Sequence, residues 1–196
     1  MLKQQLKNHK IILASGSPRR QQFLKELELD FEIQLKPVDE IYPEHLQAEA
    51  ITDYLAELKA AAFREEIQPK EILITSDTIV WHNGKALGKP LDKSQAKQMI
   101  AELSNDWHQV ISSVCFTTSA RQITKSFTTK VHFKTLSEAE IDFYVEKYNP
   151  IDKAGAYGIQ EWIGLIGIDK IEGSYFNVVG LPTHLVYKTL IELTKQ

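Results

Sequence analysis

The order of apolar and polar positions along the chain predicts a succession of strands and helices. Short apolar runs or alternations, which are typical of strands, occupy residues 11–13, 31–35, 71–80, 110–117, 124–133, 162–171 and 175–179. Apolar residues spaced three or four apart predict helices after Ser17, at 44–63, after Asp92, after Ser137 and after Pro182. Because strands and helices are mixed and several strands are linked as hairpins, we expect an α/β fold with a mixed sheet surrounded by helices.

Cap and stop residues mark the ends of two of these helices. Asp92 with Gln95, and Ser137 with Glu140, have the spacing of a capping box, in which each side chain bonds the other's backbone N–H. Asn149-Pro150 is expected to end the second of these helices, since proline cannot continue it.

A strand, a small-residue loop and a helix are predicted in succession within residues 10–20. An apolar run precedes Ser15-Gly16-Ser17, and Ser17-Pro18 supplies an N-cap serine and a proline at the first helical position. Arg19 and Arg20 then fall in the first helical turn, whose free N–H groups already carry partial positive charge. A bound phosphate would resolve this conflict, because N–H groups, serine hydroxyls and guanidinium groups all donate hydrogen bonds to it. The alternative is that both arginine side chains point into water.

An acidic residue, Asp77, falls inside the most apolar strand. A buried carboxylate costs free energy unless it is paired or binds a metal, so Asp77 is a candidate site residue; the alternative is a carboxylate satisfied by backbone N–H groups. Asn83-Gly84 predicts a hairpin that would bring Lys89 back to the level of Asp77 and allow an ion pair. Lys59 lies on the apolar face of the second predicted helix, so its ammonium group either extends along the core to the surface or points into a cleft.

The segment 152–160 combines small residues with a polar end. Its two glycines and its alanines allow the backbone to approach another group closely. Gln160 offers both a hydrogen-bond donor and an acceptor, which are the groups needed to read the edge of a nucleotide base. Gln160 is therefore a candidate recognition residue.

Charge and cysteine content narrow the classes of function. The chain has 196 residues and a net charge of −3, with acids and bases mixed throughout, which argues against direct nucleic-acid binding. The single cysteine, Cys115, lies in an apolar run and is expected to be a buried thiol in a reducing compartment. Residues 1–10 lack the apolar part of a signal peptide, and no apolar stretch is long enough to span a membrane. We therefore expect a cytoplasmic protein without a membrane partner.

Common cofactor motifs are missing from the sequence. The histidines show no metal-ligand spacing, and neither a P-loop nor a Gly-x-Gly-x-x-Gly fingerprint occurs. No internal repeat, low-complexity tract or clear linker divides the chain.

Taken together, the motifs resemble those of the Maf family of nucleoside triphosphate pyrophosphatases. They occur in the family's order and cover nearly the whole chain: Leu13–Arg20, Ser76–Val80, Gly88–Pro90, Lys153–Gln160 and Ile171–Pro182. The sequence departs from the usual pattern at Thr75-Ser76, where glycine or alanine often precedes the acid, but this change removes no functional group.

The resemblance implies a fold and a reaction. The fold would be a single domain, 1–196, of two lobes around a long substrate groove, similar to the inosine triphosphate pyrophosphatases. The reaction would be hydrolysis of a nucleoside triphosphate between the α and β phosphates, giving a monophosphate and pyrophosphate with the help of Mg²⁺ or Mn²⁺. The combination of Pro18-Arg19, Thr78 and Gln160 is similar to the branch of the family that acts on dTTP and UTP.

The resemblance also implies roles for individual residues. Asp77 corresponds to the catalytic proton acceptor. The positions that set specificity correspond to Arg19, Thr78 and Gln160. The polar positions that line the phosphate groove correspond to Ser15, Arg20, Lys59 and Lys89. An acidic position that helps hold the metal, together with Asp77, corresponds to Glu40.

Two alternative functions stay open at this point. One is a pyrophosphatase for 7-methylguanosine triphosphate or another modified nucleotide. The other is a regulator of septum formation that acts by binding a division or nucleic-acid partner. The oligomeric state is also open, and the resemblance allows a homodimer.

Overall fold

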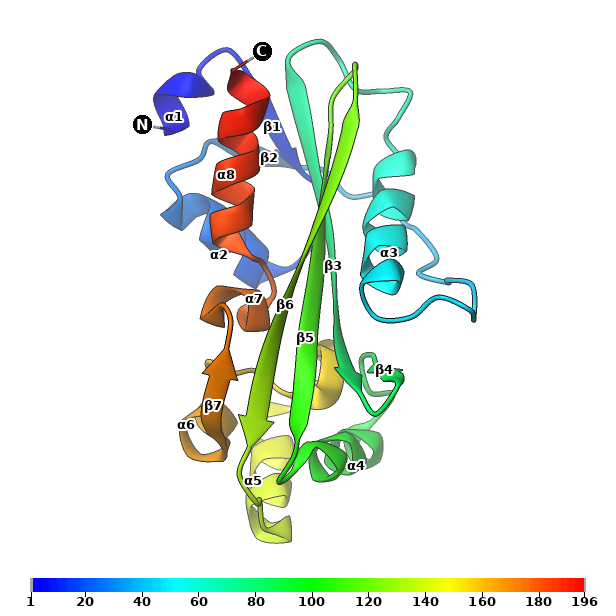
Figure 1. The fold of residues 1–196 in the computed structure, drawn as a ribbon, viewed down its shortest axis with the longest axis vertical. Helices are drawn as coiled ribbons and strands as arrows, with labels where there is room; N and C mark the ends of the chain where they lie inside the picture. Colours follow the sequence, from blue (N-terminus) through cyan, green and yellow to red (C-terminus); the bar gives the residue numbers. More distant parts are fainter. Residues whose placement is uncertain (1, 196) are drawn as a thin grey trace. The chain divides into compact units, whose positions relative to one another are not determined.

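The computed structural model describes residues 2–195, in which helices surround a mixed β-sheet (Figure 1). Its strands are β1 (Lys10–Leu13), β2 (Phe31–Ile33), β3 (Glu71–His82), β4 (Lys85–Leu87), β5 (Trp107–Thr117), β6 (Gln122–Phe133) and β7 (Ile168–Glu172). Its α-helices are α1 (Leu2–Gln5), α2 (Pro18–Glu26), α3 (Glu49–Ala61), α4 (Lys93–Leu103), α5 (Glu138–Tyr148), α6 (Trp162–Gly167), α7 (Tyr175–Val179) and α8 (Thr183–Thr194). Two 3₁₀ turns, η1 (Pro150–Asp152) and η2 (Ala154–Ala156), follow α5. No helix within residues 2–195 has both the length and the apolarity needed to cross a membrane.

The strands form one seven-stranded sheet in the order β2-β1-β3-β5-β6-β7, with β4 beside β3. Strand β1 pairs in parallel with both β2 and β3, whereas β4 pairs antiparallel with β3 and β7 antiparallel with β6. The mixed sheet with surrounding helices that the sequence predicts is therefore confirmed.

The contacts within the chain divide it into two compact units. Unit 1 comprises Met1–Asp77, Ser112–Phe127 and Gly180–Gln196, and unit 2 comprises Thr78–Ile111 and Thr128–Val179. Strands β3, β5 and β6 contribute residues to both units.

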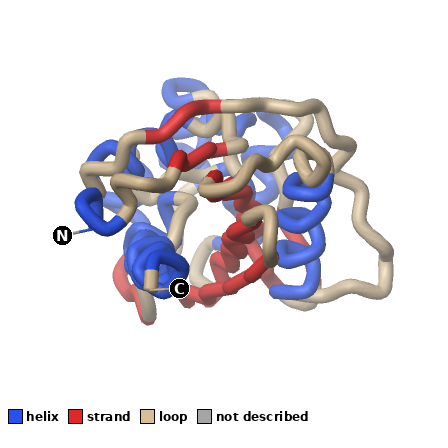
Figure 2. Tube along the Cα trace, turned by 90° about the horizontal axis from the view of Figure 1, so that it is seen from above, coloured by secondary structure: helices blue, strands red, loops and turns tan. Residues whose placement is uncertain are grey.

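In unit 1, helices pack on a short parallel ladder. Helices α1 and α8 lie side by side, and α3 and α8 lie on opposite sides of the strands (Figures 1 and 2). The core beneath α3 includes Ile12, Ala56, Leu73 and Cys115. The thiol of Cys115 is fully buried, as predicted, and this burial raises its pKa.

In unit 2, the turn and cap residues act as the sequence predicts, with one exception. Asn83 and Gly84 adopt φ values of 47° and 76°, and they join β3 to β4 in the expected hairpin. Ser137 and Glu140 form a reciprocal capping box, and Asn149 ends α5 in the left-handed conformation. The predicted capping box at Asp92 is only half formed: the Asp92 carboxylate accepts the N–H of Gln95 at 2.8 Å, but the side-chain oxygen of Gln95 accepts the N–H of Leu91 and not that of Asp92.

Three predicted elements were wrong in type or length. Residues 162–167 form helix α6 where a strand was predicted, and only Ile168–Glu172 is a strand. Residues 175–179 form helix α7, which is fixed by the buried Asn177 amide donating to the Val110 carbonyl at 2.9 Å. The helix predicted at 44–63 begins only at Glu49. In each case the three-dimensional contacts outweigh local preference.

Candidate active site

The loop between β1 and α2 places serine hydroxyls and arginines at a helix N-terminus. Ser17 is the N-cap of α2, where its Oγ accepts the backbone N–H of Arg20 at 3.5 Å, and Pro18 follows at the first helical position. The N–H of Ser17 in turn donates to the Oγ of the buried Ser15 at 3.3 Å. Arg19, on the same turn, is half-buried. The predicted succession of strand, loop and helix is therefore confirmed.

The guanidinium group of Arg20 is held by hydrogen bonds to two backbone carbonyl groups. Its Nε donates to the Gly180 carbonyl at 3.0 Å, and its Nη1 donates to the Ser76 carbonyl at 2.7 Å. Burial lowers the pKa of Arg20 and the charge of Asp77 acts in the opposite direction, but a guanidinium stays protonated in proteins. Arg20 thus joins α2 to β3 and to the segment before α8. The sequence assigns the guanidinium group of Arg20 to phosphate binding. In the structure, two of its N–H groups bond backbone carbonyls and so stabilise unit 1.

Asp77 is a buried carboxylate that forms an ion pair with Lys59. The Nζ of Lys59 lies 2.6 Å from Oδ1 of Asp77 and 3.0 Å from Oε1 of Glu40, so one ammonium group bridges two carboxylates. The side chain of Asp77 is 9% exposed and that of Glu40 is 48% exposed, so this cluster reaches from the interior to the surface. Burial raises the pKa of Asp77, and the positive charge of Lys59 opposes that rise. The lysine paired with Asp77 is therefore Lys59 of α3, whereas the predicted hairpin pointed to Lys89.

A second contact fixes α3 against β3. The hydroxyl of Thr75 donates to the carbonyl of Ala56 at 2.7 Å. Thr75 and Asp77 are two residues apart on a strand and share one face, and Ala56 and Lys59 are three apart on a helix and share one side. The two contacts between α3 and β3 therefore lie next to each other, and together they hold the side chain of Lys59 beside Asp77. Thr75 was missed by sequence reasoning, since threonine is a common strand residue.

The donor set of Glu40 and Asp77 fits a divalent cation that arrives with a phosphate ligand. Their carboxylates converge on the same ammonium group. Within residues 2–195, no group of three or more His, Cys, Asp or Glu side chains is arranged to hold a metal ion. Mg²⁺ commonly binds through one or two carboxylates and completes its shell with water and substrate phosphates. Glu40 and Asp77, whose carboxylates are bridged by Lys59, are therefore the residues that could serve as protein ligands for a cation bound together with a nucleotide.

The predicted site residues are distributed over the two units. Those of unit 1 are Ser15, Arg19, Arg20, Glu40, Lys59 and Asp77. Those of unit 2 are Thr78, Lys89 and Gln160. Thr78 is half-buried and follows Asp77 directly on β3, whereas Lys89 and Gln160 are exposed. Within unit 1, the structure brings Ser15 to Arg20, and it brings Glu40 and Asp77 to Lys59.

The segment before Gln160 is fixed by close packing, as its small residues predict. Gly155 has a φ of 65°, and a Cβ at this position would lie 2.7 Å from the side chain of Val80, so only glycine fits. The hydroxyl of Tyr157 forms a buried hydrogen bond of 2.7 Å with Nε2 of His108. The exposed Gln160 therefore follows a firmly held stretch of backbone.

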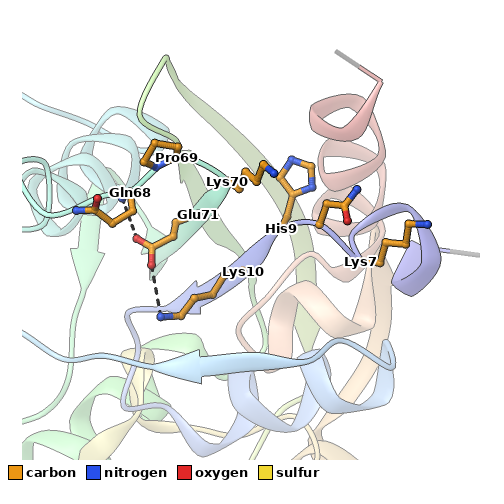
Figure 3. Close-up of a pocket in the computed structure, with 8 residues that line it drawn as sticks. Lys7, His9, Lys10, Gln68, Pro69, Lys70 and Glu71 are labelled. Atoms are coloured by element: carbon orange, nitrogen blue, oxygen red, sulfur yellow. Dashed lines mark hydrogen bonds and ion pairs between the residues drawn. The ribbon is translucent and has the colours of Figure 1, made fainter.

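A shallow polar pocket of about 470 Å³ lies in unit 1 at the start of β1 and β3 (Figure 3). It is lined by residues 7–10 and 68–71, and Glu71 pairs with Lys10 there at 3.4 Å. Glu71 begins β3 and Asp77 follows six residues later, a separation of roughly 20 Å along a strand. The lining residues include none of the predicted site residues, all of which lie within the described part of the chain.

Comparison with known proteins agrees with the motifs. A family model described as Maf-like protein matches residues 10–193. Relatives from Flavobacterium johnsoniae and Christiangramia forsetii are 60% and 58% identical over 193 residues, and both are named dTTP/UTP pyrophosphatase. These alignments cover 98% of this chain and 100% and 98% of the respective relatives. Among solved structures, the Staphylococcus aureus Ham1 protein has a similar fold, with a TM-score of 0.54 at 16% identity over 92% of this chain and 99% of that one.

Proposed function

The chain belongs to the Maf-like protein family, and on that basis we propose that it hydrolyses dTTP and UTP between the α and β phosphates, releasing a monophosphate and pyrophosphate. Matches over nearly the full chain to relatives named for this activity support the proposal. The single structural observation that carries it is the buried Asp77 carboxylate, which Lys59 links to Glu40. Phosphoryl transfer depends mainly on positioning and charge neutralisation; this cluster would supply the positioning, and a cation together with the basic side chains would neutralise the charge.

Asp77 is the proposed general base. It would accept a proton from the water molecule that attacks the α-phosphorus. The contact of 2.6 Å with Lys59 fixes the direction of the carboxylate, and its burial keeps bulk water from competing for it. A positioned base of this kind accelerates a reaction by about 10²- to 10⁴-fold.

The charge of the triphosphate requires several partners. Glu40 and Asp77 would hold Mg²⁺ or Mn²⁺, and such a cation neutralises phosphate charge and lowers the pKa of bound water. The side chains proposed to bind the phosphate oxygens are Ser15, Arg19, Arg20, Lys59 and Lys89. Of these, Arg20 also carries its two hydrogen bonds to backbone carbonyls, so it would act from a fixed position.

The base would be recognised by Gln160, with Thr78 and Arg19 as further specificity residues. Thymine and uracil both present an N–H group at ring position N3. The amide oxygen of Gln160 can accept this hydrogen bond, and its exposure leaves it accessible to a ligand.

The test is pyrophosphate release from dTTP, UTP, CTP, dATP, GTP and 7-methyl-GTP with Mg²⁺ or Mn²⁺. We expect dTTP and UTP to be preferred and to yield monophosphates. Asp77→Asn should lower kcat by about 10²- to 10⁴-fold without unfolding the protein. Glu71→Gln is the matched control, because Glu71 is an acid on the same strand that also pairs with a lysine. Preference for 7-methyl-GTP, or full activity of Asp77→Asn, would contradict the proposal.

A further inference from the structure

Glu161, the residue after Gln160, is held by two side chains of unit 2. The hydroxyl of the fully buried Tyr144 donates a hydrogen bond to its Oε2. The ammonium group of the buried Lys153 lies 3.2 Å from its Oε1. The Glu161 side chain itself is 20% exposed, so a fixed carboxylate stands at the edge of the surface beside Gln160.

The carboxylate of Glu161 and the amide of Gln160 both lie over Gly158. A Cβ on Gly158 would lie 3.1 Å from Oε2 of Glu161 and 3.1 Å from Nε2 of Gln160. The N–H of Gly158 donates to the hydroxyl of Tyr144 at 3.0 Å, so the same hydroxyl fixes the backbone under both side chains.

The two 3.1 Å distances place Nε2 of Gln160 and Oε2 of Glu161 no more than about 6 Å apart, and at this range the charge of the carboxylate favours one orientation of the Gln160 amide. A carboxylate oxygen attracts the NH₂ end of an amide and repels its carbonyl end. With Nε2 toward Glu161, the carbonyl oxygen Oε1 is turned away from the carboxylate. If the amide were turned by 180°, Oε1 of Gln160 would face the carboxylate of Glu161. Both groups are hydrogen-bond acceptors, so this orientation is unfavourable. The group that Gln160 offers to a ligand is therefore an acceptor.

We propose that Glu161 is a positioning residue for base selectivity, which orients Gln160 so that Oε1 accepts the N3–H of uracil or thymine and disfavours cytosine. Cytosine carries no hydrogen at N3, so its N3 is a hydrogen-bond acceptor. It would face Oε1 of Gln160, which is also an acceptor, and no hydrogen bond could form. An amide free to rotate by 180° would serve either base, so selectivity requires the orientation to be held. This inference rests on the proposed function, in which Gln160 contacts the base.

The test is the ratio of kcat/KM for UTP to that for CTP in the full-length enzyme and in Glu161→Gln. The substitution keeps the size of the side chain and an acceptor for Tyr144, but removes the charge that orients the amide. We expect the ratio to fall about tenfold, mainly through improved use of CTP, since one hydrogen bond of ordinary net strength corresponds to about this factor. Tyr148→Phe is the control, because Tyr148 stacks on Tyr144 in the same helix, at 5.2 Å between ring centroids, and its substitution should leave the ratio unchanged.

A double-mutant cycle separates orientation from general damage to the site. In a Gln160→Ala background, Glu161→Gln should cause no further change in the ratio, because no amide is left to orient. An unchanged ratio in Glu161→Gln, or an equal loss of kcat/KM for both substrates, would overturn the inference. If Glu161→Gln shows no cooperative thermal transition, the ratio is measured in Tyr144→Phe, which removes one of the hydrogen bonds that hold Glu161. The same outcomes then support or overturn the inference.

The two proposals can fail separately. A wild-type enzyme that releases no pyrophosphate from UTP or dTTP would overturn the proposed function. A wild-type enzyme that prefers UTP to CTP, with the same preference in Glu161→Gln, would overturn only the role of Glu161.

Discussion

Acid should destabilise this protein through one buried histidine. His108 is 2% exposed, its Nε2 is hydrogen-bonded to the Tyr157 hydroxyl at 2.7 Å, and its Nδ1 has no hydrogen-bond partner within the described residues. Burial lowers the pKa of His108 from 6.5 to about 3, and the nearby His82 and His132 act in the same direction while Asp106 opposes them. Protonation of the folded state would bury a charge and add an N–H group without an acceptor.

The sign of the pH dependence follows from this lowered pKa. Above pH 6.5 the imidazole is neutral in both the folded and the unfolded protein. As the pH falls from 6.5 toward 3, the unfolded chain binds a proton that the folded protein does not, so the free energy of unfolding decreases. The loss is about 1.4 kcal/mol per pH unit in this window. Between pH 7 and pH 5 it amounts to about 2 kcal/mol.

Urea unfolding at pH 7, 6 and 5 measures this effect. At a typical slope of about 2 kcal/mol per molar urea, the midpoint should fall by about 1 M between pH 7 and pH 5 from His108 alone. In His108→Gln, which can still bond the Tyr157 hydroxyl, this part of the pH dependence should vanish. His45→Gln is the control, since His45 is an exposed histidine and its replacement should leave the pH dependence unchanged. Identical pH dependence in wild type and His108→Gln would refute the reasoning.

Two further predictions concern stability. Gly155→Ala should lower the free energy of unfolding by about 3 kcal/mol in urea titrations, because the new Cβ would meet Val80 at 2.7 Å in a backbone conformation that favours glycine. Gly88→Ala, where nothing lies within 4 Å of the new Cβ, should cost far less, and equal losses would contradict the packing argument. Thr75→Val, which keeps the size of the buried side chain, should lower stability by about 1 kcal/mol through loss of its hydrogen bond to Ala56; a melting temperature equal to that of the wild type would argue against this contact.

Local sequence signals predicted those elements whose ends are set by local chemistry. Ser17-Pro18, Asn83-Gly84 and the capping box at Ser137 each define a boundary with side chains a few residues apart. The same is true of the buried carboxylate Asp77, because an acid inside an apolar strand is conspicuous without any knowledge of the fold.

Features that depend on residues far apart in the sequence could not be predicted from local patterns. Residues 162–167 are apolar and aromatic enough to predict a strand, but Gly164 lies so close to Ile159 that a Cβ would be 1.8 Å from its carbonyl oxygen, and α6 forms there. The bridge from Glu40 through Lys59 to Asp77 joins a loop, a helix and a strand, so it follows from the fold and from no local pattern. Tyr144 lies on the apolar face of α5, and sequence pattern alone assigns it to the core.

The contact between Arg20 and Gly180 has a consequence for the order in which the protein is made. It joins residues 160 positions apart, and every residue of unit 2 lies between them. At a synthesis rate of about 5–20 residues per second, Arg20 waits roughly 10 to 30 s for this partner to emerge. Unit 2 is therefore fully synthesised while unit 1 still lacks α8. During that interval the apolar surfaces that α8 covers remain exposed, which is the condition under which nascent segments aggregate and chaperones bind.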